Sequence, residues 1–286
     1  MVQHEWHPDP AQLRARLTAG VREAAAQGAA LVCLAELTMS RYFASDQRGA
    51  HAAGVIPEPL PGGPTHSFVA ELAKSCGVFV QASVYERSAE FALGFNTNIC
   101  VDPSGALVAR TRKTHLPITA GYYEDRYFTH GDSGTPVHEI ADMRVGFPTC
   151  WDEWFPELAR AYALGGADVL VYPTAIGSEP EFPEFDTAPL WRSVIVGHAI
   201  ANGLFVLVPN RCGIEPGDPG IEFYGSSFVV DPYGRILAEA PRNEPCVLVA
   251  ELDLDARRDW LELFPFFETR RPDVYGVLLD EGDPPA

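Results

Sequence analysis

The sequence lacks any run of about eighteen apolar residues, and no basic segment followed by an apolar one stands at its N-terminus. A transmembrane helix and a signal peptide are therefore not predicted, and we expect a cytoplasmic protein. Basic residues are also scarce: 21 lysines and arginines oppose 39 aspartates and glutamates, for a net charge of −18. Such a chain repels polyanions, which argues against nucleic acid and against membrane surfaces as partners.

Closely paired cysteines and linker-like segments are absent as well. No stretch is rich enough in proline, glycine or serine to separate two domains. With 286 residues and 47% hydrophobic composition, the chain can bury one large core, so we predict a single domain over residues 1–286. We expect all six cysteines to be reduced thiols: Cys33, Cys76, Cys100, Cys150, Cys212 and Cys246.

Helical and strand patterns alternate along the chain. Asp9 and Pro10 fit the cap and first position of a helix whose apolar residues recur at helical spacing until Gly28. The apolar run from Ala30 to Ala35 predicts a strand covered on both faces, with Glu36 at its C-terminal end. Further helices are predicted over 65–76, from 156 and over 189–202, and further strands over 78–85, 168–172 and 204–208.

Two similar turns predict β-hairpins. Residues 102–105 and 231–234 both have Asp-Pro at the first two turn positions and Gly at the fourth. Together with the alternating helices and strands, they predict an α/β fold with some antiparallel pairing.

Cys150 stands out among the cysteines because it lies where a strand is expected to meet the start of a helix. Amides at a helix start favour a thiolate and can donate to a developing oxyanion. On local evidence, a structural cysteine and a nucleophile are equally supported. Cys212 has a similar position and is the rival nucleophile, whereas the other cysteines are interpreted as small buried hydrophobes.

A thiol nucleophile needs a base, and no histidine pairs persuasively with Cys150. His115 is expected on the opposite face from Lys113. His4 and His7 have a spacing seen in metal sites, but they lack further ligands and are expected at the surface, so no metal site is predicted. Glu36 is the better base, because a buried carboxylate is costly unless it has a purpose or a partner.

Taken together, Glu36, Lys113 and Cys150 resemble the Glu-Lys-Cys set of the nitrilase, or carbon–nitrogen hydrolase, superfamily. The motifs are Leu34-Ala35-Glu36-Leu37, Arg112-Lys113-Thr114-His115-Leu116-Pro117 and Cys150-Trp151-Asp152-Glu153-Trp154-Phe155-Pro156-Glu157. The likeness extends from about Gln3 to about Leu279. It implies that Glu36 is the base, Lys113 the oxyanion stabiliser and Cys150 the nucleophile. It also implies that Glu124 orients Lys113 or the substrate.

A narrower likeness points to the N-carbamoylputrescine amidases within this superfamily. It rests on residues 121–124, 172–180, 197–199 and 223–228, and on Arg270 to Asp273. The implied partner is a small cationic carbamoyl amine. Its ammonium would pair with Glu179, unless that residue is simply a solvated loop acid, and Trp151 and Tyr123 would also bind substrate.

Two other functions stay open. A related amidase or ureidopropionase-like enzyme would act on an anionic ureido acid and would need a cationic clamp, for which Arg192 and Arg211 are candidates. A non-catalytic binding homologue is the second alternative.

The superfamily likeness implies a four-layer α-β-β-α sandwich, no metal or organic cofactor, and a homo-oligomer, with the tail from about residue 264 in subunit contacts. The sequence departs from the family pattern at Pro148-Thr149, where aliphatic residues are usual. Because proline removes a strand donor, the local strand geometry there is open to question.

Overall fold

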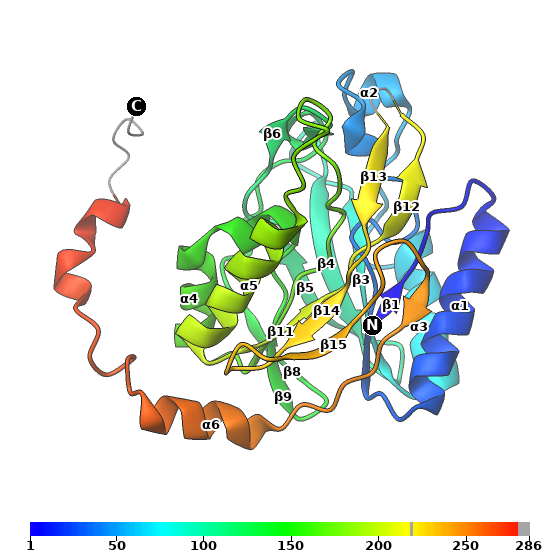
Figure 1. Cartoon of the computed structure of the whole chain (residues 1–286). Coiled ribbons are helices and arrows are strands. Elements are labelled where there is room, and N and C mark those ends of the chain that lie inside the picture. Colours follow the sequence, from blue (N-terminus) through cyan, green and yellow to red (C-terminus); the bar gives the residue numbers. More distant parts are fainter. Residues whose placement is uncertain (218–219, 280–286) are drawn as a thin grey trace.

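The computed structural model describes residues 1–217 and 220–279, which form two central β-sheets with helices outside them (Figure 1). The helices are α1 (Pro10–Ala26), α2 (Ala50–Ala53), α3 (Pro64–Cys76), α4 (Pro156–Leu164), α5 (Ala188–Asn202) and α6 (Leu254–Leu263). Short 3₁₀ turns are η1 (Phe43–Ser45), η2 (Glu124–Arg126), η3 (Cys150–Trp154), η4 (Pro272–Val274) and η5 (Gly276–Leu279).

The larger sheet has six strands in the order β15-β14-β11-β10-β9-β8, and the smaller has four in the order β2-β3-β4-β5. The pairs β9/β10, β10/β11 and β2/β3 are parallel, and the remaining pairs in these two sheets are antiparallel. The strands are β1 (Val2–Gln3), β2 (Leu31–Cys33), β3 (Phe79–Glu86), β4 (Phe95–Val101), β5 (Leu107–Arg112), β6 (Ile118–Thr119), β7 (Tyr122–Tyr123), β8 (Val137–Ile140), β9 (Met143–Gly146), β10 (Val169–Val171), β11 (Phe205–Val208), β12 (Cys212–Glu215), β13 (Ile221–Tyr224), β14 (Phe228–Val230), β15 (Ile236–Glu239) and β16 (Cys246–Val247).

Alternation of side chains along the strands builds the layers. In β3, Val80 and Ala82 pack with the apolar faces of α1 and α3. In β10, Leu170 packs with residues of α4 and α5, whereas Val169 and Val171 point to the other side and contact residues of both sheets. The fold is therefore the predicted four-layer α-β-β-α sandwich.

Most predicted elements are confirmed. The Asp9 carboxylate accepts a 2.9 Å hydrogen bond from the Ala11 amide at the start of α1. Both predicted turns close hairpins, β4–β5 and β14–β15. In each, the glycine amide donates to the aspartate carbonyl, at 2.8 Å for Gly105 and 2.9 Å for Gly234.

Three local expectations were wrong. Strand β2 ends at Cys33, so Glu36 lies beyond it in a turn rather than at its last position. Cys150 lies in a five-residue 3₁₀ turn rather than at the start of an α-helix, although α4 does begin at Pro156 as predicted. His4 is buried instead of exposed, and burial lowers the pKa of its imidazole to about 3.

The C-terminal segment leaves the sandwich after β16 and runs alongside it through α6 to η5 (Figure 1). It carries large exposed apolar side chains, namely Leu263, Phe264, Val274, Val277, Leu278 and Leu279. A role for this tail in subunit contacts stays a prediction. No helix within residues 1–217 and 220–279 is both long and apolar enough to cross a bilayer.

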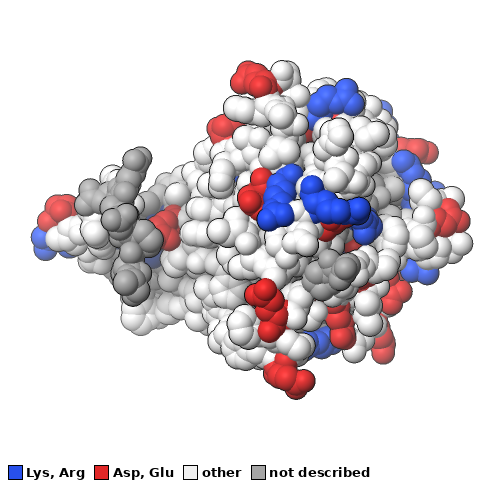
Figure 2. All heavy atoms as spheres, turned by 90° about the horizontal axis from the view of Figure 1, so that it is seen from above, with Lys and Arg blue, Asp and Glu red and all other residues white. Residues whose placement is uncertain are grey.

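Charged groups on the face seen from above are mixed. Acidic and basic side chains lie among a majority of uncharged residues, and the acidic ones do not gather into one patch there (Figure 2). This face therefore presents no single acidic patch.

The packing of α1 on the smaller sheet can be tested at Leu17, which is fully buried in that layer. We expect Leu17→Ala to lower the free energy of unfolding by about 2–5 kcal/mol, because it removes buried methyl groups and leaves a cavity. Leu237→Ala, at a side chain that is 39% exposed, should cost much less. Denaturant titration measures both, and equal losses would contradict the layer assignment.

Candidate active site

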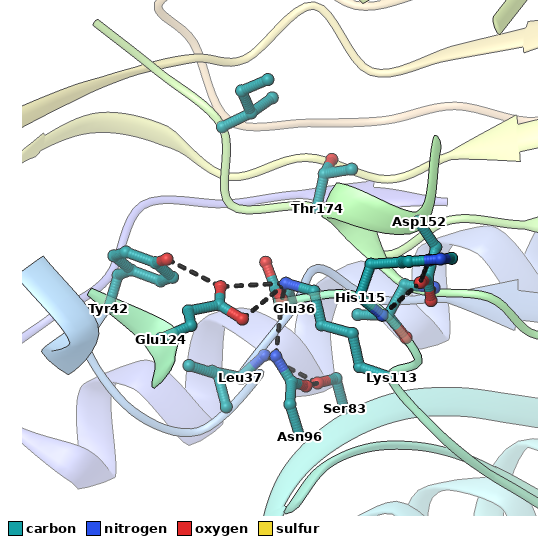
Figure 3. A network of polar contacts seen from close by, with 12 residues as sticks. Glu36, Leu37, Tyr42, Ser83, Asn96, Lys113, His115, Glu124, Asp152 and Thr174 are labelled. Carbon is teal, nitrogen blue, oxygen red and sulfur yellow. Dashed lines mark hydrogen bonds and ion pairs between the residues drawn. The ribbon is translucent and has the colours of Figure 1, made fainter. Parts of the chain in front are cut away.

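A buried ammonium between two carboxylates forms the centre of the site (Figure 3). The Lys113 Nζ lies 2.9 Å from Glu36 Oε1, and 2.9 and 2.7 Å from the two oxygens of Glu124. All three side chains are fully buried. Glu36 lies in the turn after β2, Lys113 directly follows β5, and Glu124 begins the 3₁₀ turn η2. The fold thus joins segments that are far apart in the chain.

Glu36 is held by its backbone and by one carboxylate oxygen. Its amide donates to the Thr174 carbonyl at 3.3 Å. Its Oε1 accepts from Lys113 and, at 2.6 Å, from the Asn96 side-chain amide. Its Oε2 is buried and has no hydrogen-bond partner among the described residues. One oxygen is thus fixed while the other remains available to exchange a proton.

Cys150 is fixed next to Glu36 by the segment after β10. The Cys150 amide donates to the Pro173 carbonyl at 3.0 Å, one residue before the carbonyl that accepts from the Glu36 amide. Cys150 has a φ of 43°, in the left-handed region that costs a non-glycine residue about 1–2 kcal/mol. Pro148 does not disturb this arrangement, because β9 already ends at Gly146.

Burial decides the protonation of the nucleophile. It raises the pKa of the Cys150 thiol well above its ordinary value, and nearby Glu36 raises it further despite the opposing effect of Lys113. The resting thiol is therefore protonated and needs a base. Burial works against the charge on Lys113, but Glu124 and Glu36 together raise its pKa, so the ammonium persists. Burial also raises the pKa of Glu124 to about 7, although Lys113 opposes it.

Asp152 ties the lysine segment to the nucleophile turn. Its carboxylate accepts from the Thr149 amide at 3.0 Å and from the His115 amide at 2.9 Å, and contacts His115 Nδ1 at 2.8 Å. The His115 ring stacks on Phe155 with centroids 3.6 Å apart. Sequence reasoning missed this role of Asp152, as it missed Asn96. The available signal was the polar pair Asn96 and Asn98 within the strand-like segment Phe95–Val101.

A cleft of about 400 Å³ contains two of the three predicted substrate-binding residues, Tyr123 and Glu179. Burial raises the pKa of the Glu179 carboxyl, which also accepts a 3.4 Å hydrogen bond from Thr187. The other lining residues are Ile118, Thr119, Ala120, Glu181 and Phe182. Trp151 is not among the described residues that line this cleft. It packs near Trp154, at 6.3 Å between ring centroids.

Neither arginine proposed as a clamp for an anionic substrate is free. Arg211 is fully buried and forms an ion pair with Glu215. Arg192 pairs with Glu239 at 2.6 Å on the surface. The rival nucleophile Cys212 lies within β12, where burial raises the pKa of its thiol to about 12.

Metal-ligand groupings are also absent from residues 1–217 and 220–279, where no cluster of three or more His, Cys, Asp or Glu side chains could hold an ion.

Comparison with known proteins shows the family of the chain. A model of the carbon–nitrogen hydrolase family matches residues 1–262. The chain belongs to the carbon–nitrogen hydrolase family. It is an amidase of the nitrilase superfamily and acts on a small amide.

Individual relatives cover nearly the whole chain. N-carbamoylputrescine amidase of Arabidopsis thaliana is 40% identical over 91% of this chain and 87% of its own. Citrullinase of Francisella tularensis is 35% identical over 98% and 96%. The crystal structure of a carbon–nitrogen hydrolase from Helicobacter pylori G27 superposes with a TM-score of 0.87 at 33% identity, covering 99% and 98%.

Lys113→Met tests the charge balance of the carbon–nitrogen hydrolase site. The variant leaves two buried carboxylates without their ammonium, and we expect a loss of about 3–5 kcal/mol at neutral pH. Burial raises the pKa of Glu124 to about 7, and without Lys113 the main opposition to this rise above the unfolded value of about 4.3 is lost. The stability of the variant is therefore retained below the unfolded value and is lost as the pH rises through the folded-state pKa of Glu124.

Denaturant titrations at pH 5.5 and pH 8 measure this effect, with the difference from wild type expected to be larger at pH 8. Lys74 is the other lysine of the chain and is exposed on α3, so Lys74→Met is the matched control. A loss of the same size at both pH values would contradict the charge assignment.

Proposed function

We propose that the protein hydrolyses N-carbamoylputrescine to putrescine, carbon dioxide and ammonia. The observation that carries this reaction is the state of the Glu36 carboxylate. One of its oxygens is held by Lys113 and Asn96, and the other is buried and has no hydrogen-bond partner among the described residues. This arrangement suits a base that serves a buried thiol.

In the first half of the reaction, Glu36 Oε2 takes the proton of Cys150 Sγ, and the sulfur attacks the ureido carbonyl carbon. Lys113, with a backbone amide, stabilises the resulting oxyanion. The two Lys113 contacts with Glu124 go to one carboxylate, so a single N–H can serve both and another can face the oxyanion. Glu36 returns the proton to the leaving nitrogen, ammonia departs, and a carbamoyl thioester remains on Cys150.

In the second half, Glu36 takes a proton from water, and the hydroxide attacks the thioester carbon. The carbon–sulfur bond breaks and the thiol regains its proton. The released carbamate loses carbon dioxide to leave putrescine. Throughout, Glu124 keeps Lys113 in place through its two contacts.

The cationic substrate is favoured by the charges of the cleft. Two carboxylates, Glu179 and Glu181, line it, and no lysine or arginine is among its described lining residues. A substrate ammonium beside Glu179 would gain a charge-assisted contact. Tyr123 and Trp151 are proposed to contact the rest of the chain of the substrate. Relatives named N-carbamoylputrescine amidase at about 40% identity support the same choice.

Citrulline is the second candidate, because the citrullinase relative covers 98% of this chain. It has the same ureido group, but its distal end carries a carboxylate as well as an ammonium. An α-carboxylate would meet Glu179 and Glu181 without a cationic partner in the cleft. We therefore expect the carbamoyl amine to be the better substrate when both are compared directly by ammonia release.

Cys150→Ala should reduce ammonia release from N-carbamoylputrescine by at least about 10³-fold, because it removes the sulfur that forms the covalent intermediate. Cys212→Ala removes a buried thiol of similar size and should keep most of the activity. Coupled detection of ammonia measures both variants. Activity that survives in Cys150→Ala and disappears in Cys212→Ala would move the nucleophile.

Glu179→Gln should raise the KM for N-carbamoylputrescine about 10-fold or more, the size of a hydrogen bond to a charged group. The KM for N-butylurea, which lacks the ammonium, should stay nearly constant. Glu184→Gln, at an exposed acid of the same loop, is the control variant. If Glu179→Gln raises the KM for both substrates by the same factor, Glu179 does not bind the substrate ammonium.

A further inference from the structure

Arg211 reaches the backbone that carries the catalytic base. Its Nη2 donates to the carbonyls of Glu36 at 2.5 Å, Leu37 at 3.1 Å and Ser40 at 3.2 Å. Leu37 has a φ of 48°, a left-handed conformation that side chains disfavour. A fully buried guanidinium thus clamps three carbonyls of a strained turn, and this turn determines where the Glu36 side chain points.

Arg211 also forms an ion pair with Glu215, and this pair is connected to the second catalytic acid, Glu124. Arg211 Nη1 donates to Glu215, whose Oε2 accepts from the Tyr42 amide at 2.6 Å. The Tyr42 hydroxyl then donates to Glu124 Oε1 at 2.7 Å (Figure 3). Because Glu124 and Glu36 both hold Lys113, the contacts close into a ring that begins and ends at Glu36.

Burying the Arg211–Glu215 ion pair costs free energy, so its presence in the core calls for a functional reason. A buried ion pair gains little stability over well-packed apolar residues, since both charges lose their hydration. Arg211 is fully buried and Glu215 is 5% exposed. The comparable pair Asp231–Arg235, with the same spacing in sequence, leaves its arginine largely in solvent and closes a hairpin turn. Of these two pairs, only Arg211–Glu215 is connected to the catalytic acids, at the Glu36 backbone carbonyl and, through Tyr42, at Glu124.

We propose that Arg211, Glu215 and Tyr42 are positioning residues, which hold Glu36 and Glu124 at the separation that lets one ammonium bridge them. This inference rests on the proposed roles of Glu36, Glu124 and Lys113. It does not depend on which amide is hydrolysed.

Tyr42→Phe is the most selective test, because it removes one hydroxyl from the ring and keeps the aromatic packing. We expect kcat to fall about tenfold, with KM changed less than about threefold. The lost donor also stabilised ionised Glu124, whose pKa lies at about 7. Removing it raises that pKa, so the acid limb of the kcat profile should move to higher pH.

A double variant distinguishes positioning from general destabilisation. Glu215→Gln should lower kcat in the wild-type background, and its effect should be clearly smaller in the Tyr42→Phe background, because the part of the effect that reaches Glu124 passes through the Tyr42 hydroxyl. Asp231→Asn removes a buried acid of an equally spaced pair and should leave kcat and its pH profile unchanged. Thermal unfolding of every variant confirms that each is folded under the assay conditions.

The proposal is overturned if Tyr42→Phe retains the wild-type kcat and pH profile. It is also overturned if Tyr42→Phe and Glu215→Gln act independently, so that the double variant loses kcat by the full product of the two single losses. A failure of the proposed function looks different, since wild type itself would then leave N-carbamoylputrescine intact. In that case the same variants are compared on whichever simple amide, such as propionamide, the wild type hydrolyses.

Discussion

The structure depends on one interaction, the sharing of the Lys113 ammonium between Glu36 and Glu124 in a space without solvent access. Each of these charges alone would be too costly to bury, and the ammonium between the two carboxyl groups offsets part of that cost. Burial, and after it the nearby Glu36, raises the pKa of the Cys150 thiol and keeps it protonated at rest, while the free oxygen of Glu36 can accept its proton. The same three side chains, Lys113, Glu36 and Glu124, therefore serve the reaction and balance the charge in the core.

The two-sheet architecture brings these groups together. Glu36 and Cys150 follow β2 and β9, one strand from each sheet, and adjacent carbonyls after β10 hold both backbones. Ends of parallel strands are common places for sites because they gather loops at one edge of a sheet. Between the sheets, polar side chains such as Asn96 and Ser83 continue the network into the core. The apolar layers elsewhere keep this polar seam enclosed.

Local sequence patterns and the order of the motifs along the chain were enough to predict part of the fold and of the site. Capping at Asp9, the two proline turns and the alternation of helices with strands required no tertiary information, and the Glu-Lys-Cys order identified the family. The ring through Arg211, Glu215 and Tyr42 was not predictable, because its partners lie up to 175 residues apart and its bonds depend on side-chain direction. For the same reason Arg211 appeared only as a candidate clamp, beside Arg192, for the alternative of an anionic ureido acid, and the burial of His4 was missed.

The most direct measurement of the central claim is the order in which the cysteines react with acrylamide, a small electrophilic amide, followed by peptide mass spectrometry. If Glu36 and Lys113 activate a buried nucleophile, Cys150 should be modified before Cys76, which is more exposed, and N-carbamoylputrescine should slow its modification. Modification of Cys76 or Cys246 while Cys150 remains a free thiol would contradict the account.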